Sequence, residues 1–413
     1  MNSQSLLGLF AFPLFAWLIS ENRRDVRLKT VFVGIAAQLV LGALLLKISI
    51  FRDLFLWLNK AVITLETSTR AGTSFVFGYL GGGALPFDEK FPGASFVLAL
   101  QGLPLILVVS ALSAVLFYWG VLPLIVRGFA FVLGKLMDIG GAAGLGAAAN
   151  IFVGMIESPL LVKPYLRKMT RSELFLVMTC GMATIAGNMM VLYASILTPI
   201  IPASMGHILT ASLISAPAAI MIAKLIVPET MGSTSASLAS TQTYGSTMDA
   251  ITKGTTDGIA LLINIIAMLI VLVALVSLVN SIFGLLPYVA GEVLTLQRVL
   301  GWIMAPLVWF MGVPWSEAVT AGSMMGVKTV LNEFLAYLQM AQLPKGTLSY
   351  RTELIMTYAM CGFANFGSLG IMIGGIGSMV PERRDEIINL GLKSIVAGTL
   401  ATMMTGCIAG LFG

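Results

Sequence analysis

Long apolar runs separated by short polar stretches dominate the chain, and they predict helices that cross a membrane. A bilayer core of about 30 Å needs roughly 20 helical residues, because each residue of a helix adds about 1.5 Å. Eight runs come near that length: 6–20, 30–50, 96–126, 174–197, 208–227, 258–283, 353–380 and 387–411. We therefore predict an all-α polytopic membrane protein with eight transmembrane helices.

Composition agrees with this pattern. Of the 413 residues, 58% are hydrophobic and 10% are charged, against about 25% charged in soluble proteins. So few charges cannot cover the surface of a soluble chain of this length, which excludes soluble enzymes. The net charge of +5 comes from short basic clusters between apolar runs, so no nucleic-acid partner is expected.

Two further apolar segments, 139–162 and 300–343, are interrupted by glycine, proline and acidic residues. Basic residues form three clusters, at 23–29, 163–171 and 383–393, and cytoplasmic loops carry an excess of Lys and Arg. All three clusters can share the cytoplasmic side only when each interrupted segment enters and leaves by the same face. We therefore expect two re-entrant helical hairpins, and both chain ends outside the cytoplasm.

A seven-residue pattern occurs twice, as Cys180-Gly-Met-Ala-Thr-Ile-Ala and as Cys361-Gly-Phe-Ala-Asn-Phe-Gly. Each copy lies in an apolar span after an interrupted segment, so the repeating unit is hairpin, broken helix, helix. The two hairpins are expected on opposite sides of the membrane, which gives the repeats inverted topology. Such repeats are typical of secondary transporters, whose substrate lies near the midplane where the broken helices meet.

These features divide the chain into five parts. Residues 1–138 hold N-terminal membrane and interfacial helices, 139–228 the first repeat, 229–249 a Ser/Thr-rich linker, 250–293 a further helix, and 294–413 the second repeat.

Two lone glutamates, Glu157 and Glu333, occupy equivalent places in the two hairpins. A carboxylate at the bilayer centre costs a few kcal/mol, so such residues usually mark a functional site. A carboxylate accepts hydrogen bonds, which favours a solute rich in donors, and nearby amide and hydroxyl groups suit a sugar or a base. Lys328 could pair with Glu333 or shape the hairpin tip, and we assign it a structural role.

Three strings carry a resemblance to a known family: Asn150-Ile-Phe-Val-Gly-Met-Ile-Glu157-Ser-Pro, Gly326-Val-Lys-Thr-Val-Leu-Asn-Glu333-Phe-Leu-Ala-Tyr and Cys361-Gly-Phe-Ala-Asn365-Phe-Gly-Ser368. They resemble the concentrative nucleoside transporter family, and the similarity covers essentially the whole chain. The resemblance implies a cation-coupled nucleoside importer in the bacterial inner membrane, with nucleoside, Na⁺ and membrane lipid as partners. It further implies a homotrimer, an elevator mechanism, and a scaffold formed mainly by 1–138 and 250–293.

The resemblance also implies site residues. Glu157 would face the nucleobase, Glu333 with Asn365 and Ser368 would bind the ribose, and Phe363 would lie beside the substrate. Further substrate contacts are expected from Gly154, Met155, Ile156, Met189 and Asn332. A Na⁺ site would use Asn150, Val153, Thr184 and Ile185, whose oxygen ligands suit a hard cation.

One departure from the family concerns the first hairpin. The family commonly has Gly-Gln-Thr-Glu where this chain has Gly154-Met-Ile-Glu157, so two polar base contacts become apolar. Met155 is flexible and polarisable and could pack on a base face. We therefore expect intact sugar recognition and atypical nucleobase selectivity.

Other readings of the sequence are a proton-coupled symporter, with Glu157 or Glu333 carrying the proton, and a passive channel. A membrane-embedded enzyme would need a nucleophile with a base, or two ligated metals. The single His207 and the scattered carboxylates supply neither, and the three cysteines lie inside apolar runs. We therefore expect no enzyme activity and no cofactor besides the coupling ion.

Overall fold

The computed structural model describes residues 2–89, 95–155, 157–231, 234, 244–289 and 291–413. All regular elements in these ranges are helices, which confirms the all-α prediction for this part of the chain. The helices are α1 (Asn2–Leu18), α2 (Leu28–Lys47), α3 (Ser49–Phe77), α4 (Leu105–Tyr118), α5 (Val121–Met137), α6 (Gly141–Asn150), α7 (Glu157–Leu161), α8 (Lys163–Leu166), α9 (Arg171–Ala183), α10 (Gly187–Leu197), α11 (Ser204–Ile226), α12 (Thr247–Phe283), α13 (Leu296–Phe310), α14 (Trp315–Val330), α15 (Glu333–Gln342), α16 (Tyr350–Ala359), α17 (Phe366–Met379) and α18 (Arg384–Phe412). Short turns of other helix types are η1 (Gly78–Gly81), η2 (Leu98–Gly102) and η3 (Pro381–Arg383).

Several helices are long and apolar enough to cross a membrane. Among the described residues there are 5, or up to 6 if α13 and α14 together form one bent span. The predicted total of eight is larger because it includes α1 and the two interrupted helices, α9 with α10 and α16 with α17. Each of these pieces is a short helix on its own. The chain is therefore a helical membrane protein, and the count of eight spans stays a prediction.

Three predicted boundaries differ from the structure. The run 96–126 does not form one helix, because Gly120 takes a φ of 76° between α4 and α5. The segment 300–343 begins earlier, at α13, and a bend of 116° separates α13 from α14 before the hairpin tip. The helix predicted from 258 begins at Thr247, where the Ser246 side chain accepts a hydrogen bond from the N–H of Asp249.

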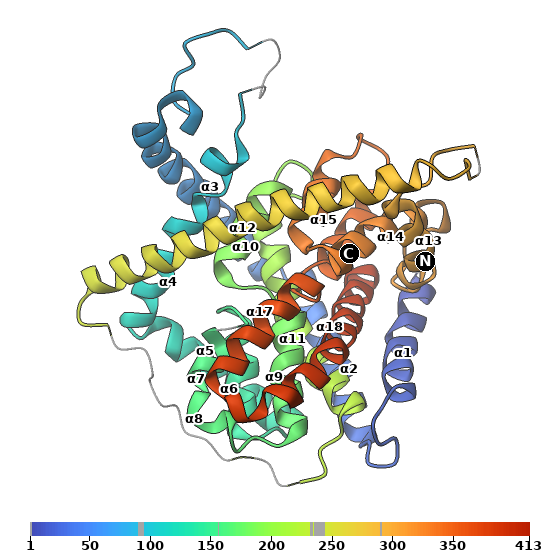
Figure 1. The fold of residues 1–413 in the computed structure, drawn as a ribbon. Coiled ribbons are helices and arrows are strands. Elements are labelled where there is room, and N and C mark those ends of the chain that lie inside the picture. The colour runs from blue at the N-terminus through green and yellow to red at the C-terminus, as the bar shows by residue number, and fades with distance from the viewer. Residues whose placement is uncertain (1, 90–94, 156, 232–233, 235–243, 290) are drawn as a thin grey trace.

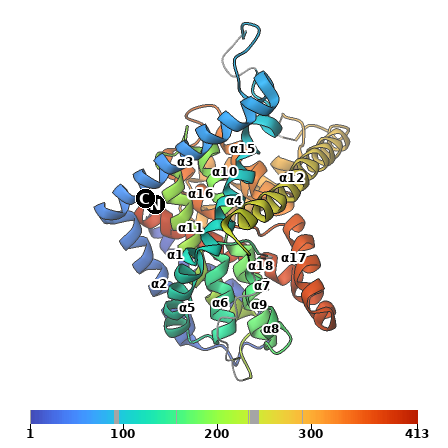
Figure 2. The same cartoon turned by 90° about the vertical axis from the view of Figure 1, so that its left-hand side faces the viewer.

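The centre of the molecule consists of α9, α11 and the second half of α18, whose side chains are almost all buried. The long helix α12 lies across the outside of this bundle, next to α4 (Figure 1). Helix α3 lies on another outer face and carries the chain away from the bundle at its end (Figure 2). Helices α6, α9 and α10 are thus packed inside, α3, α4 and α12 form an outer layer, and α17 lies at the edge of the molecule with one face exposed (Figure 2).

The order helix pair, interrupted helix, helix occurs twice, and the assignment of the two helix pairs as re-entrant hairpins stays a prediction. The first copy is α6 and α7, then α9 and α10, then α11; the second is α14 and α15, then α16 and α17, then α18. The two breaks touch each other, because the backbone N–H of Phe363 donates to the carbonyl oxygen of Thr184 at 3.3 Å. Unpaired backbone at membrane depth is tolerated where it is buried in protein, and Thr184 and Phe363 are both buried.

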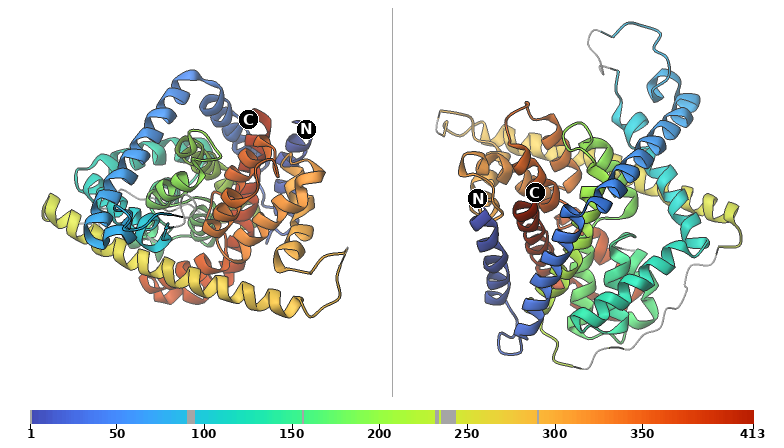
Figure 3. Two further views of the ribbon diagram at one scale, coloured as in Figure 1. Left: turned by 90° about the horizontal axis from the view of Figure 1, so that it is seen from above. Right: turned by 180° about the vertical axis from the view of Figure 1, so that it is seen from behind.

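The three basic clusters meet at one end of the molecule. Glu21, in the loop between α1 and α2, accepts hydrogen bonds from Arg171 at 2.8 Å and from Lys393 at 2.6 Å. Arg383 donates to the carbonyl oxygen of Met169 at 2.6 Å. The two chain ends lie close to each other and away from these clusters (Figure 3). The clusters therefore share one side, as expected, and the assignment of that side to the cytoplasm stays a prediction.

Candidate functional site

The tip of the first hairpin is hydrogen-bonded to the break between α9 and α10. The Thr184 hydroxyl lies 2.8 Å from the carbonyl oxygens of both Asn150 and Cys180, and can donate to either. The N–H of Gly187 donates to the carbonyl oxygen of Phe152 at 3.0 Å. A Cβ at Gly187 would lie 2.8 Å from that oxygen, so glycine permits this close approach.

Asn150 presents an unused oxygen at this junction. Its amide nitrogen donates to the carbonyl oxygen of Gly146 at 3.1 Å, and the side chain is 1% exposed. Its Oδ1 is buried and accepts no hydrogen bond from any residue that the structure describes. Leaving a buried acceptor unpaired costs about 1–3 kcal/mol, which a bound cation would recover.

The predicted Na⁺ ligands lie together at this junction. Val153 follows Phe152 in the hairpin tip, and Ile185 follows Thr184 in the helix break. Amide, hydroxyl and backbone carbonyl oxygens are the donors that a hard monovalent cation prefers. The residues present therefore fit the predicted ion.

Glu333 lies in a separate, buried cluster at the tip of the second hairpin. Its Oε1 accepts a hydrogen bond from the Tyr193 hydroxyl at 2.6 Å, and its Oε2 accepts one from the Asn365 amide at 2.8 Å. The residue is 4% exposed. Sequence reasoning missed Tyr193, although a phenol within the apolar run 174–197 is a polar group at membrane depth that could have been flagged.

Two asparagines fix the geometry around Glu333 by capping helices. Asn332 Oδ1 accepts from the N–H of Leu335 at the start of α15, and Asn365 Oδ1 accepts from the N–H of Ser368 at the start of α17. N-terminal ends of helices carry partial positive charge, and α15 itself begins at Glu333. Of the predicted ribose residues, the structure brings Glu333 and Asn365 into direct contact, with Ser368 one helical turn away.

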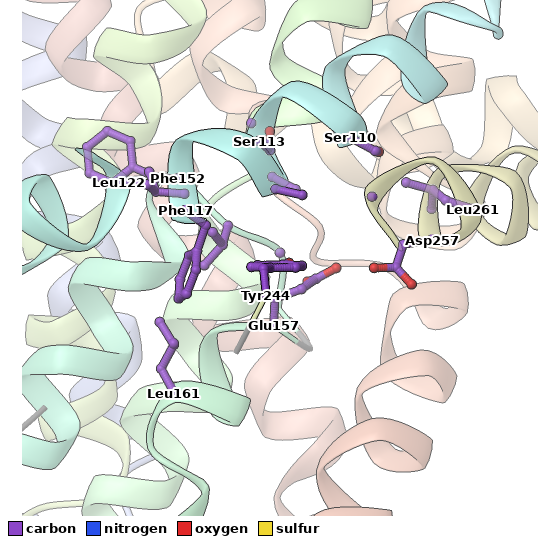
Figure 4. Close-up of a pocket in the computed structure, with 16 residues that line it drawn as sticks. Ser110, Ser113, Phe117, Leu122, Phe152, Glu157, Leu161, Tyr244, Asp257 and Leu261 are labelled. Atoms are coloured by element: carbon purple, nitrogen blue, oxygen red, sulfur yellow. The ribbon is translucent and has the colours of Figure 1, made fainter. Parts of the chain in front are cut away.

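Glu157 occupies a more open position. It lines a cavity of about 160 Å³ together with Val153 and Gly154 of the same hairpin (Figure 4). Met155 and Met189 are buried, with 9% and 6% of their surface exposed, and neither lines this cavity.

The predicted substrate residues therefore fall into two groups. Glu157 and Gly154 line the open cavity, whereas Glu333, Asn332, Phe363, Asn365 and Ser368 are not part of its lining. Ile156 lies outside the described residues.

The facing wall of the cavity was not predicted. It consists of Ser110, Ser113 and Phe117 of α4, Tyr244 of the linker, and Asp257 and Leu261 of α12. The Tyr244 ring packs edge-on against Phe117, with ring centroids 6.4 Å apart. Asp257 directly precedes the apolar run from 258, and a carboxylate at that position could have been noticed in the sequence.

Lys328 is fully buried in the last turn of α14, the first arm of the second hairpin. Its ammonium donates to the Thr402 hydroxyl at 3.0 Å and to the carbonyl oxygen of Ala359, the last residue of α16, at 3.4 Å. A cation is favoured at the C-terminal end of a helix, where the dipole is negative.

Two pairs of short helices, each packed against an interrupted helix, form the arrangement that is typical of secondary transporters. Three family models match the chain: "Na+ dependent nucleoside transporter" N-terminus over residues 7–80, "Nucleoside recognition" over 99–200, and "Na+ dependent nucleoside transporter" C-terminus over 207–410. The chain belongs to the concentrative nucleoside transporter family. It is a nucleoside transporter of this family and not an enzyme.

Individual relatives agree with this assignment. The chain is 39% identical to the uncharacterized transporter YutK of Bacillus subtilis over 98% of each chain. It is 36% identical to the nucleoside permease NupC of Helicobacter pylori, covering 99% of this chain and 97% of that one.

Solved structures of a related transporter, CNTnw, match over the whole fold. An inward-facing, substrate-bound state aligns with a TM-score of 0.91 at 38% identity, covering 99% of this chain and 98% of that one. A doubly substituted variant in an outward-facing state aligns with a TM-score of 0.92 at 38% identity, covering 100% and 97%.

Proposed function

We propose that the protein imports nucleosides into the cell by coupling their movement to Na⁺, through an elevator-type alternating-access mechanism. The observation that carries the ion assignment is the buried, unpaired Oδ1 of Asn150 beside the Thr184 hydroxyl. The family model, described as Na⁺ dependent, supports the same ion.

The proposed ion site couples to substrate through the hairpin tip. A cation held by Asn150, Val153, Thr184 and Ile185 would hold the tip against the helix break, and Glu157 follows directly in the same tip. Each positive charge that crosses 100 mV releases about 2.3 kcal/mol, which supports somewhat under fifty-fold accumulation. Ion binding would thereby order the base end of the substrate site.

The proposed ribose site is the Glu333 cluster. Its carboxylate already accepts two hydrogen bonds from neutral donors, Tyr193 and Asn365, so ribose hydroxyls would replace donors of the same kind. Glu157 would accept hydrogen bonds from the base, and Met155 in place of a polar residue is the basis for proposing atypical base selectivity. Phe363, Asn332, Ser368 and Met189 complete the proposed site.

The elevator proposal divides the chain into moving and static parts. Residues 139–228 and 294–413, which hold both hairpins and both interrupted helices, would move as the transport domain. Residues 1–138 and 250–293 would form mainly the scaffold, joined to the first repeat by the linker 229–249. Matches to inward-facing and outward-facing states of CNTnw support alternating access.

We further propose a homotrimer in the bacterial plasma membrane with both chain ends outside the cytoplasm. The trimer follows from the family resemblance. The orientation follows from the three basic clusters, which lie together at one end of the molecule and are expected in the cytoplasm.

Uptake of labelled nucleosides into proteoliposomes tests the proposal. An inward Na⁺ gradient at fixed pH and fixed voltage should drive accumulation, and replacing Na⁺ by K⁺ should stop it. Accumulation that follows a proton gradient without Na⁺ would establish the proton-coupled alternative. Equilibration without accumulation under every gradient would instead identify a passive channel.

A further inference from the structure

The cavity at Glu157 has a second acidic wall. Glu157 approaches from the first hairpin, and Asp257 approaches from α12 on the facing side (Figure 4). The side chain of Asp257 is exposed to the cavity, and it forms no hydrogen bond or ion pair with the residues that the structure describes. A carboxylate in a membrane helix is costly, so its position calls for a functional explanation.

Close packing of α12 on α4 fixes the direction of this carboxylate. A Cβ at Gly254 would lie 2.8 Å from the carbonyl oxygen of Ser110, and one at Gly258 would lie 3.1 Å from Cα of Leu107. The two glycines are one helical turn apart, so they set the rotation of α12 about its axis. Asp257 therefore lies beside the α4 contact, at the rim of the cavity, and not on the outer face of α12.

We propose that Asp257 determines nucleobase selectivity, favouring bases that carry an exocyclic amino group. The inference rests on the proposed function, in which Glu157 faces the base. Ionised carboxylates only accept hydrogen bonds, so a base between Glu157 and Asp257 meets acceptors on two walls. At position 4, the amino group of cytosine donates to such a wall, whereas the carbonyl of uracil is repelled by it.

The substitution of polar by apolar residues in the hairpin strengthens this reading. Met155 offers no hydrogen-bond donor to a base carbonyl. Nucleobase selectivity would therefore come from Asp257 of α12 and not from the hairpin. Leu261, one helical turn beyond Asp257, would pack against the ring of the base.

Cytidine and uridine are the probes, because they differ only in the amino group or carbonyl at position 4 and the protonation of the adjacent ring nitrogen. The wild-type protein should take up cytidine in preference to uridine. Asp257→Asn should lower the cytidine-to-uridine uptake ratio by about tenfold, because the amide loses the charge of the acceptor and gains a donor. Asp257→Glu keeps the carboxylate and should keep the direction of the preference.

Asp249→Asn is the matched control, since Asp249 lies on the same helix and pairs with Lys253 at 2.8 Å outside the cavity. It should leave the ratio unchanged. In the wild-type protein, a cytidine analogue lacking the 4-amino group should also compete less well than cytidine, which tests the inference without any substitution.

Other results would overturn the inference. The inference would be overturned if Asp257→Asn left the cytidine-to-uridine ratio unchanged, or if it altered the Na⁺ dependence without altering that ratio. It would also be overturned if the analogue without the amino group competed as well as cytidine. In all three cases nucleosides are still transported, so the proposed function stands. Absence of any nucleoside uptake by the wild-type protein would overturn the proposed function itself.

Discussion

The side-chain amide of Asn365 donates a hydrogen bond of 2.8 Å to the carboxylate of Glu333, and so joins the second helix break to the tip of the second hairpin. Asn365 also caps α17 through its Oδ1. One side chain thus orients the carboxylate and starts the helix, which leaves both residues little freedom to rearrange. A buried acceptor held in this way is preorganised to accept hydrogen bonds from hydroxyl groups.

Glu333→Gln should nearly abolish nucleoside binding, with a loss of about 100-fold or more, because the charge that strengthens its hydrogen bonds is removed. Tyr193→Phe serves as the matched control. It removes one donor but keeps the carboxylate, so the loss should be smaller, about tenfold. Equilibrium binding of labelled nucleoside to purified protein measures both. Wild-type affinity in Glu333→Gln would refute the ribose assignment.

Thr184→Val should raise the Na⁺ concentration needed for half-maximal uptake, since valine keeps the shape of threonine but removes the hydroxyl oxygen. We expect an increase of about tenfold, the effect of losing one polar ligand contact. Thr184→Ser keeps the oxygen and should stay near the wild-type value. The order of preference among nucleosides should not change in either variant. If Na⁺ activation were the same in the valine variant as in the wild type, Thr184 would not belong to the site.

Much of the architecture could be predicted from the sequence, because membrane helices depend on long apolar runs. The repeat was visible in the paired Cys-Gly patterns, and the structure brings their breaks into contact at Thr184 and Phe363. Helix ends were harder to predict, because they depend on single residues such as Gly120 and Ser246. The length of an apolar run does not show the effect of such residues.

The candidate site was predicted in part for a physical reason. Lone polar residues in apolar hairpins, such as Glu157 and Glu333, are conspicuous in a sequence. Tyr193 was missed because tyrosine is counted among the hydrophobic residues of an apolar run. Asp257 was missed because the predicted helix began at residue 258, directly after it. Which helix faces the hairpin is decided by packing, here by Gly254 against α4, and no local pattern reveals it.

Lys328→Met should weaken substrate binding and lower the stability of the protein. The ammonium donates to Thr402 and Ala359, and its charge lies near the buried carboxylate of Glu333, so methionine leaves that carboxylate uncompensated at a cost of about 3 kcal/mol. The thermal midpoint in detergent should therefore fall below that of the wild type. Nucleoside binding should fall, because the buried carboxylate of Glu333 loses the nearby positive charge. Unimpaired binding would leave Lys328 with a packing role alone.

The Glu21 network should make stability depend on pH. Hydrogen bonds from Arg171, and after it from Lys393, lower the pKa of the Glu21 carboxyl from 4.5 to about 2, against the opposing effect of partial burial. A depressed pKa stabilises the folded state above the unfolded pKa, and this stabilisation is lost as the pH falls from 4.5 toward 2.

Glu21→Gln should therefore lower the thermal midpoint near pH 7, and the difference from the wild type should shrink below pH 4.5. The charges are partly exposed to solvent, so we expect about 1 kcal/mol, or roughly 2–4 °C. Glu382→Gln is the control: its pair with Arg167 is longer, at 3.4 Å, and both side chains are more than half exposed. It should change the midpoint little at any pH. A difference for Glu21→Gln that stays constant from pH 7 down to pH 3 would show that the carboxylate charge does not stabilise this end of the molecule.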